Sequence, residues 1–201
     1  DNQEEEEEDD EISVDDEKDY TMILRPNVTQ RVIRSLTRTL IPSLFKIISE
    51  LSTTTAHKLN KEERRLKEKT DMIRIPIALP LIKLLQKLPP QFLKQYLSQV
   101  VLKVSTFLRS SLKQVRATTR HVLKEILLAL GVDHLETVIG NLSAILCKGF
   151  QVHVLSITVH TLIDTLKDQL TCEIADKILQ KIIDTTAMMI RTSSTMPPMS
   201  A

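Results

Sequence analysis

Basic side chains recur at helical spacing in two stretches of this 201-residue sequence and crowd a third stretch between predicted helices. Residues three and four positions apart lie on one side of a helix, so the two spaced sets predict positive ridges rather than scattered charges. Such a ridge can contact phosphates along an RNA backbone and give affinity without reading bases. The candidate contacts are Arg31, Arg34 and Arg38, then Lys61, Arg64 and Arg65, and finally Lys113, Arg116, Arg120 and Lys124.

Two of these sets also have a purely structural interpretation. Arg116 and Arg120 are placed where stacked helical repeats use arginines to pair with acids of the adjacent repeat. The middle set lies in a dense charged run, in which ordinary ion pairs between residues four apart explain the charges equally well. This run also contains Lys58, Lys67, Lys69, Glu62, Glu63 and Glu68. The sequence leaves RNA contact and structural pairing open for both sets.

Histidine spacing does not predict a metal site or a catalytic site. His153 and His160 lie seven residues apart, on one face of a predicted helix. A metal site needs further Cys, His, Asp or Glu ligands close by, and none converges there. We therefore expect these two side chains to pack or hydrogen-bond between repeats, and we expect the same of the isolated His121 and His134.

The remaining composition excludes several classes of enzyme and binding module. The three glycines form no G-x-G or P-loop pattern, so no nucleotide cofactor is expected. No serine lies on a glycine-flanked elbow, and aromatic residues make up only 3% of the chain, too few for the stacking platforms of RNA-binding sheets. Cys147 and Cys172 lack a C-x-x-C partner and are expected to be buried and reduced. The sequence predicts no catalytic residue, no metal, no cofactor and no small-molecule substrate.

The net charge of +1 conceals two oppositely charged parts. Residues 1–19 hold thirteen acids and one lysine, whereas residues 20–201 hold 26 bases and 13 acids. A segment so acidic and so poor in apolar residues is expected to remain disordered. It is either an inert loop or a competitor that folds back over the basic body. The excess positive charge of the remainder indicates an anionic partner.

The chain lacks an apolar run of the roughly 18 residues that a membrane span requires, so we expect a soluble intracellular protein without a membrane partner. The sequence begins inside an acidic run without an initiator methionine, which suggests a segment of a longer protein. Residues 193–201 contain two adjacent prolines and are expected to form a linker or frayed terminus.

Apolar periodicity predicts an all-α fold of about seven helices. Thr29 is the expected N-cap of the first helix, and Pro42 is expected to kink that helix rather than end it. The charged run 58–71 has almost no apolar stripe and is expected to be a solvated connector or an exposed helical extension. The predicted helices are 29–57, 73–88, 91–110, 114–130, 133–148, 151–169 and 173–191.

An internal repeat relates these helices. A shift of 38 positions aligns six apolar pairs, a shift of 37 aligns the helices that follow, and a shift of 40 gives a partial third copy. Helix pairs that repeat at this interval are typical of a HEAT or armadillo-like α-solenoid spanning residues 20–192, in which each pair buries its apolar face against its neighbours. The first set of pairs is Leu97/Leu135, Val100/Val138, Val101/Ile139, Val104/Leu142, Phe107/Ile145 and Leu108/Leu146, and the second begins with Val115/Val152 and continues with Ala117/Val154, Val122/Val159 and Ile126/Ile163.

Three strings in a fixed order give a more specific resemblance. They are RIPIALPLIKLLQKLP at 74–89, VRATTRHVLKEILLALG at 115–131 and GFQVHVLSITVH at 149–160. Together they resemble the large HEAT-repeat scaffold of the small-subunit processome, the small nucleolar RNA-associated protein 20 family. The resemblance covers residues 72–169, about half of the chain.

The resemblance implies a non-catalytic scaffold segment in the nucleolus, within the nucleus. Its implied partners are processome proteins and pre-ribosomal or small nucleolar RNA, and its implied role is the organisation of pre-18S ribosomal RNA and assembly factors in the 90S pre-ribosome. An alternative is a HEAT adaptor of the nuclear-transport or microtubule-regulator type, which binds protein cargo. A third hypothesis is a helical array that regulates an enzyme domain elsewhere in a longer protein.

Overall fold

The computed structural model describes residues 26–49, 60–146 and 151–194, and within these ranges the chain is helical without a strand. This confirms the all-α prediction. The acidic segment 1–19, Cys147 and residues 195–201 lie outside the described residues. The elements are α1 (Pro26–Ser35), the π-helical turn η1 (Leu36–Leu40), α2 (Ile41–Ser49), α3 (Lys61–Arg74), the 3-10 turn η3 (Ile75–Ile77), α4 (Ala78–Lys87), α5 (Pro90–Thr106), η4 (Phe107–Arg109), α6 (Lys113–Leu130), η5 (Val132–His134), α7 (Leu135–Ile145), α8 (Gln151–Leu166), η6 (Lys167–Gln169) and α9 (Cys172–Ser194).

The first described rod joins α1, η1 and α2. Its described part starts at Pro26, so Thr29 lies inside α1 and the expected N-cap was wrong. Further along, the Ile41 N–H donates to the Leu36 carbonyl five residues back, which forms a wide π-type turn directly before Pro42. The rod therefore continues past Pro42 as predicted. The backbone hydrogen bonds change to the π-type pattern next to the proline, which has no N–H to donate.

The second rod joins α3, η3 and α4. The charged run is helical from Lys61, so the alternative of a helical extension is correct for its described part. A reciprocal cap starts this helix: the Asn60 side chain accepts from the Glu63 N–H at 2.8 Å, and the Glu63 carboxylate accepts from the Asn60 N–H at 2.9 Å. Such a capping box satisfies two backbone donors that a helix start leaves free. Pro76 falls in the tighter 3-10 turn, and the rod continues into α4.

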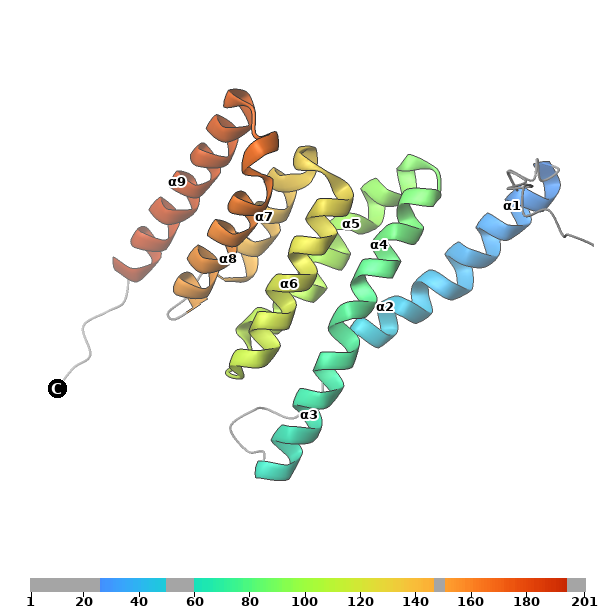
Figure 1. Ribbon diagram of the computed structural model, residues 1–201, viewed down its shortest axis with the longest axis horizontal. Coiled ribbons are helices and arrows are strands. Elements are labelled where there is room, and N and C mark those ends of the chain that lie inside the picture. The colour runs from blue at the N-terminus through green and yellow to red at the C-terminus, as the bar shows by residue number, and fades with distance from the viewer. Residues whose placement is uncertain (1–25, 50–59, 147–150, 195–201) are drawn as a thin grey trace, which may run out of the picture.

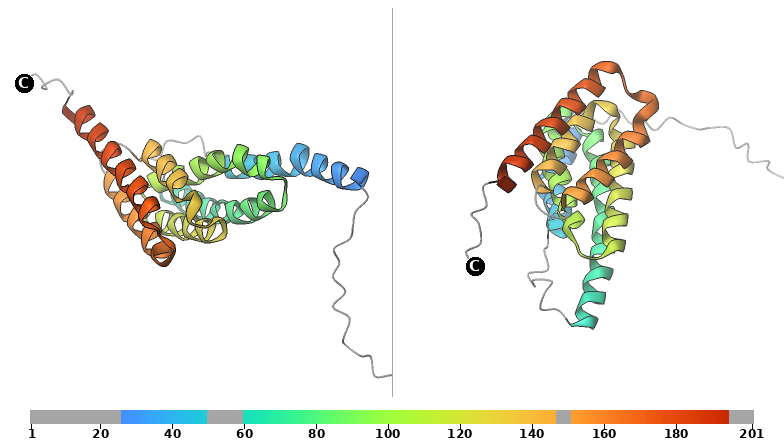
Figure 2. Two further views of the ribbon diagram at one scale, coloured as in Figure 1. Left: turned by 90° about the horizontal axis from the view of Figure 1, so that it is seen from above. Right: turned by 90° about the vertical axis from the view of Figure 1, so that its left-hand side faces the viewer.

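The rods stack in two layers. One layer contains α2, α5, α7 and α9 side by side, and the other contains α3 with α4, then α6, then α8 (Figure 1). Consecutive rods alternate between the layers, and α4, α5, α6 and α7 also pack across them (Figure 2). This arrangement is compatible with the predicted solenoid of antiparallel helix pairs, because each pair contacts chiefly the pair before and the pair after it.

The 38-position shift describes the α5 and α7 layer accurately. Five of its six pairs are buried in both copies, and the pair Phe107/Ile145 is partly buried in both. These helices pack directly against each other. The repeat read from the sequence is therefore also the repeat of the core in this layer.

The 37-position shift for the second helices was right for one pair, Val122 and Val159, which are both buried, but wrong at its start. It pairs Val115, which is 0% exposed, with Val152, which is 38% exposed. A shift of 39 pairs Val115 with Val154 and Thr119 with Thr158, and all four side chains are buried. Each threonine hydroxyl also donates to the carbonyl four residues before it, at 2.7 Å in both copies. Each residue of α6 therefore has its structural equivalent in α8 39 positions later in the sequence.

The partial third copy at a shift of 40 falls on α9. Val138 and Ile178 are both buried, but Leu179 is 56% exposed whereas its partner Ile139 is 1% exposed. The difference arises because α7 packs against both α5 and α9, whereas α9 has α7 as its main partner among the described helices. No helix in the described part of the chain is long and apolar enough to cross a membrane.

Candidate nucleic-acid interface

The structure places the ten basic candidates on three separate helices. Arg31 and Arg34 lie on α1, and Arg38 lies on the π-turn that follows. Lys61, Arg64 and Arg65 lie on α3, and all six of these side chains are exposed. The third set lies on α6, where Lys113 is exposed and Arg116, Arg120 and Lys124 are partly buried. The structure therefore confirms the helical location of each set but does not merge them into one ridge.

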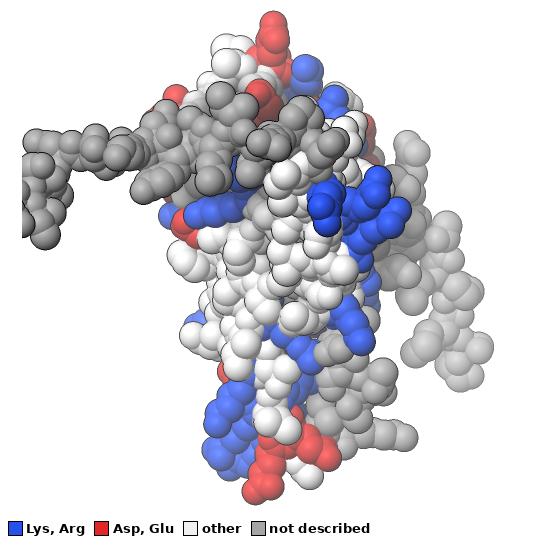
Figure 3. All heavy atoms as spheres, turned by 90° about the vertical axis from the view of Figure 1, so that its right-hand side faces the viewer, with Lys and Arg blue, Asp and Glu red and all other residues white. Residues whose placement is uncertain are grey.

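The α3 set forms a mixed-charge surface at one end of the molecule. Figure 3 shows blue Lys and Arg side chains at the lower end, where α3 begins, beside red acidic side chains. White side chains cover much of the middle of this face, and further blue side chains lie among them towards the upper end. Among the described residues, Lys61, Arg64 and Arg65 form no ion pair, so the pairing between residues four apart that the sequence allowed is not formed by them.

The α6 set is more constrained. The Arg116 guanidinium donates to the Ser110 carbonyl at 2.7 Å, across the turn that precedes the helix. Burial lowers the pKa of Arg120, and the positive charge of Arg116 one turn away lowers it further. Neither arginine pairs with an acid in the described ranges, so the inter-repeat ladder considered as an alternative is not seen there. Arg120 nevertheless remains a cation at neutral pH, because an arginine pKa begins so high.

A shallow groove between α3 and α6 was not predicted from the sequence. Basic and acidic side chains form part of its lining, together with two apolar ones, and on its α6 side the Thr118 hydroxyl lies 3.1 Å from the Met72 sulfur. The exposed apolar residues Leu66 and Ile73, seven positions apart on an otherwise charged helix, were the one sequence signal of an unusual surface there. The lining residues are Arg65, Glu68, Lys69, Met72, Ile73 and Gln114.

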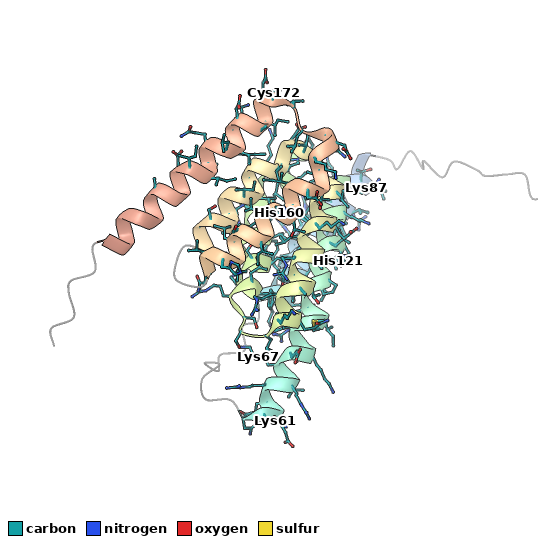
Figure 4. All side chains as sticks on the ribbon, turned by 60° about the vertical axis from the view of Figure 1, so that its left-hand side comes forward. Lys61, Lys67, Lys87, His121, His160 and Cys172 are labelled. Carbon is teal, nitrogen blue, oxygen red and sulfur yellow. The ribbon has the colours of Figure 1, made fainter. Side chains whose placement is uncertain are left out.

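The histidine expectation was wrong for α8. His153 and His160 are exposed and form no hydrogen bond with another described residue. His121 on α6 is also exposed and is the equivalent of His160 under the 39-position shift (Figure 4). Histidines at these positions point to solvent because they lie opposite the buried stripe of each helix. No group of potential metal ligands occurs among the residues that the structure describes.

For Cys172, the one cysteine within the described residues, the expected burial was wrong, whereas the expected free thiol agrees with the structure. Cys172 is exposed and carries a free thiol. It is the first residue of α9, and no other described helix covers it (Figure 4). Helix periodicity alone could not place it, because exposure at a helix start depends on the neighbouring rods.

Comparison with known proteins identifies the family. The family model for the U3 small nucleolar RNA-associated protein 20 domain matches residues 64–196, most of α3 to α9. The chain belongs to this family. The resemblance drawn from the three sequence strings is thereby confirmed, and the nucleolar localisation it implied is supported by the family assignment.

Two fungal members of the small nucleolar RNA-associated protein 20 family are similar to the chain over about half its length. The U3 small nucleolar RNA-associated protein 20 of Schizosaccharomyces pombe is 34% identical over 101 residues, which is 50% of this chain. The protein of the same name from Saccharomyces cerevisiae is 32% identical over 99 residues, which is 49% of this chain. In both comparisons the matched part is only 4% of the relative's length.

Positive charge is unevenly distributed along this family member. Residues 26–130 contain twenty Lys and Arg against six Asp and Glu, whereas residues 131–201 contain five against seven. All ten candidate contacts fall in the first part, on α1 to α6. The anionic partner indicated by composition is therefore expected at the α1–α6 end of the stack rather than along its whole length.

Proposed function

We propose that this chain is a non-catalytic scaffold segment in ribosome biogenesis, which helps to hold pre-18S ribosomal RNA and assembly factors in the small-subunit processome. The observation that carries the proposal is the family match over residues 64–196. The relatives are named for their association with the U3 small nucleolar RNA, so RNA and the proteins that accompany it are the natural partners. We place this activity in the nucleolus.

The described fold suits this role. A stack of helix pairs buries one continuous core and leaves long helical faces free for partners. The basic sets on α1, α3 and α6 offer contacts to RNA phosphates, and the exposed apolar side chains on α9 and on the groove offer contacts to proteins. In this proposal the segment performs no reaction and fixes the relative positions of the groups that bind it.

Crosslinking in assembled particles tests the proposal. The full-length protein would be purified with small-subunit precursors, irradiated and digested, and RNA-linked peptides would be identified by mass spectrometry. We expect linked peptides from α1, α3 or α6 and protein links elsewhere. Failure of the full-length protein to copurify with small-subunit precursors would contradict the scaffold function and favour the adaptor alternative, which binds protein cargo without RNA.

Salt dependence provides a second measurement on the chain itself. If about six phosphates are contacted, the logarithm of the RNA association constant falls with the logarithm of salt concentration at a slope near −4 on single strands. A salt-insensitive association would mean that partners bind through the apolar surfaces instead.

A further inference from the structure

The α6 helix carries two arginines one turn apart that are partly withdrawn from water. The Arg116 guanidinium has a single partner among the described residues, the Ser110 carbonyl at 2.7 Å. The Arg120 guanidinium has no hydrogen bond and no ion pair to any described residue. Two like charges held this close repel each other, and partial burial removes some of the water that would otherwise screen them. Within the described chain, the Ser110 carbonyl offsets part of this cost for Arg116, and no described acid offsets it for Arg120.

The neighbouring helix α8 shows which kind of side chain can occupy the equivalent positions. Under the 39-position equivalence, Arg116 corresponds to Leu155 and Arg120 corresponds to Val159. Both α8 residues belong to the hydrophobic core, with exposures of 7% and 8%. Apolar side chains thus satisfy the packing of this position in α8, and well-packed apolar residues commonly stabilise a protein as much as buried charges do or more. Packing at these positions therefore does not require arginine.

We propose that Arg116 and Arg120 form a phosphate-binding site whose ligand is a backbone phosphate of RNA. The assignment of RNA rests on the function proposed above. Positions four apart on a helix are separated by about 6 Å along its axis, so two guanidinium groups can reach oxygens of the same phosphate. Arginine offers planar, paired donors that match phosphate oxygens, and a bound anion would relieve the repulsion between the two cations.

The flanking residues of the same set extend the site. Lys113 precedes Arg116 by three positions and Lys124 follows Arg120 by four, so the four side chains follow one flank of α6. The Arg116 contact with Ser110 holds one guanidinium at the start of the helix, which reduces the side-chain freedom that binding would otherwise remove. The exposed arginines of α1 and the basic residues of α3 have no such preorganisation. They are expected to add screened, adjustable contacts to neighbouring phosphates.

The test replaces the two arginines by their α8 equivalents in the full 201-residue chain. The variant R116L/R120V is compared with K94L/K103V, which removes the same charge from exposed positions on α5. Binding of a fluorescein-labelled single-stranded RNA of about 20 nucleotides is measured by anisotropy at several salt concentrations, and thermal unfolding is followed by circular dichroism. A peptide containing one phosphoserine is measured in parallel.

We expect R116L/R120V to lose RNA affinity by about tenfold or more, since charge-assisted contacts of this kind are individually worth about a factor of ten. The salt slope should become shallower by about 0.7, as expected for the loss of one phosphate contact on a single strand. Its melting temperature should stay the same or rise. The control variant should keep its affinity to within about threefold, as expected for removal of screened surface charge.

Several outcomes overturn the site. They are an unaltered chain that does not bind the RNA at low salt, an R116L/R120V variant that binds as well as the control, and a melting temperature that falls by several degrees, which would make the arginines structural. Loss of phosphopeptide binding with unchanged RNA binding would assign the phosphate to a protein and overturn the RNA assignment. Copurification of the full-length protein with small-subunit precursors is measured separately, so the scaffold function can hold while this site fails.

Discussion

The equivalence of α6 and α8 predicts how three valines differ in their contribution to stability. Val115 is 0% exposed, its structural equivalent Val154 is 7% exposed, and Val152, its partner in the 37-position alignment, is 38% exposed. Replacing a buried valine by alanine removes two methyl-sized groups, worth about 0.8 kcal/mol each, and leaves a small cavity. We therefore expect V115A and V154A each to lower the free energy of unfolding by about 2 kcal/mol.

V152A serves as the matched control, because the same atoms are removed from a side chain that already contacts water. We expect it to lower the free energy of unfolding by less than about 0.7 kcal/mol. Urea unfolding followed by circular dichroism would measure the three changes, with the slope against denaturant checked for constancy. For a chain of this size the two buried variants should also melt about 4–8 °C lower. Equal losses in V115A and V152A, with V154A unaffected, would refute the 39-position register.

Other predictions follow from single side chains. Asp71 is buried and its pKa is raised, chiefly by desolvation, so its charge opposes folding at neutral pH. D71N should therefore raise the free energy of unfolding by about 1 kcal/mol at pH 7. This gain should vanish as pH falls through the folded-state pKa of Asp71, as urea titrations at several pH values would show. N60A breaks the cap with Glu63 and should cost about 1 kcal/mol, visible as faster amide exchange in the first turns of α3. I73S, at a position 70% exposed, should leave the melting temperature almost unchanged. I75S, at a position 0% exposed, should unfold the surrounding region, and calorimetry would measure both effects.

The helices were largely predictable because a helix must place apolar residues on one side to bury them. Leu97, Val100, Val101 and Val104 recur at three and four, and all are buried on α5. A second helix with the same pattern 38 residues later packs against the first. Periodicity and repetition were therefore sufficient for the fold class and for the layer of α5 and α7.

Prediction was less accurate where local chemistry competed with periodicity. The α3 helix has few apolar residues, so apolar periodicity did not predict it. Its start depends on the capping pair Asn60 and Glu63. The rod passes through Pro76 by tightening into a 3-10 turn, which no hydrophobic pattern encodes. Helix starts were also misplaced, as at Thr29, which lies inside α1.

The candidate interface shows the same division. Spacing placed Arg116 and Arg120 on one side of a helix and left two explanations, pairing with acids or contact with RNA. The difference between them depends on which residues of other helices approach the guanidinium groups. In the structure the Ser110 carbonyl approaches Arg116, and no described acid approaches either arginine. This observation does not support pairing with acids within the described residues, and it is the basis of the anion site proposed above.

By itself, the sequence determined that the chain is helical, that its helices repeat, to which family it is related, and that a basic body follows an acidic segment. These properties depend on composition, on residue spacing along one helix and on ordered motifs, all of which are local to the chain. The tertiary structure decided the register between α6 and α8, the exposure of Cys172 and His160, and the absence of an acid beside Arg120 in the described part. Those properties depend on which surfaces meet when the rods stack, and spacing within a single helix carries no information about the helix that packs against it.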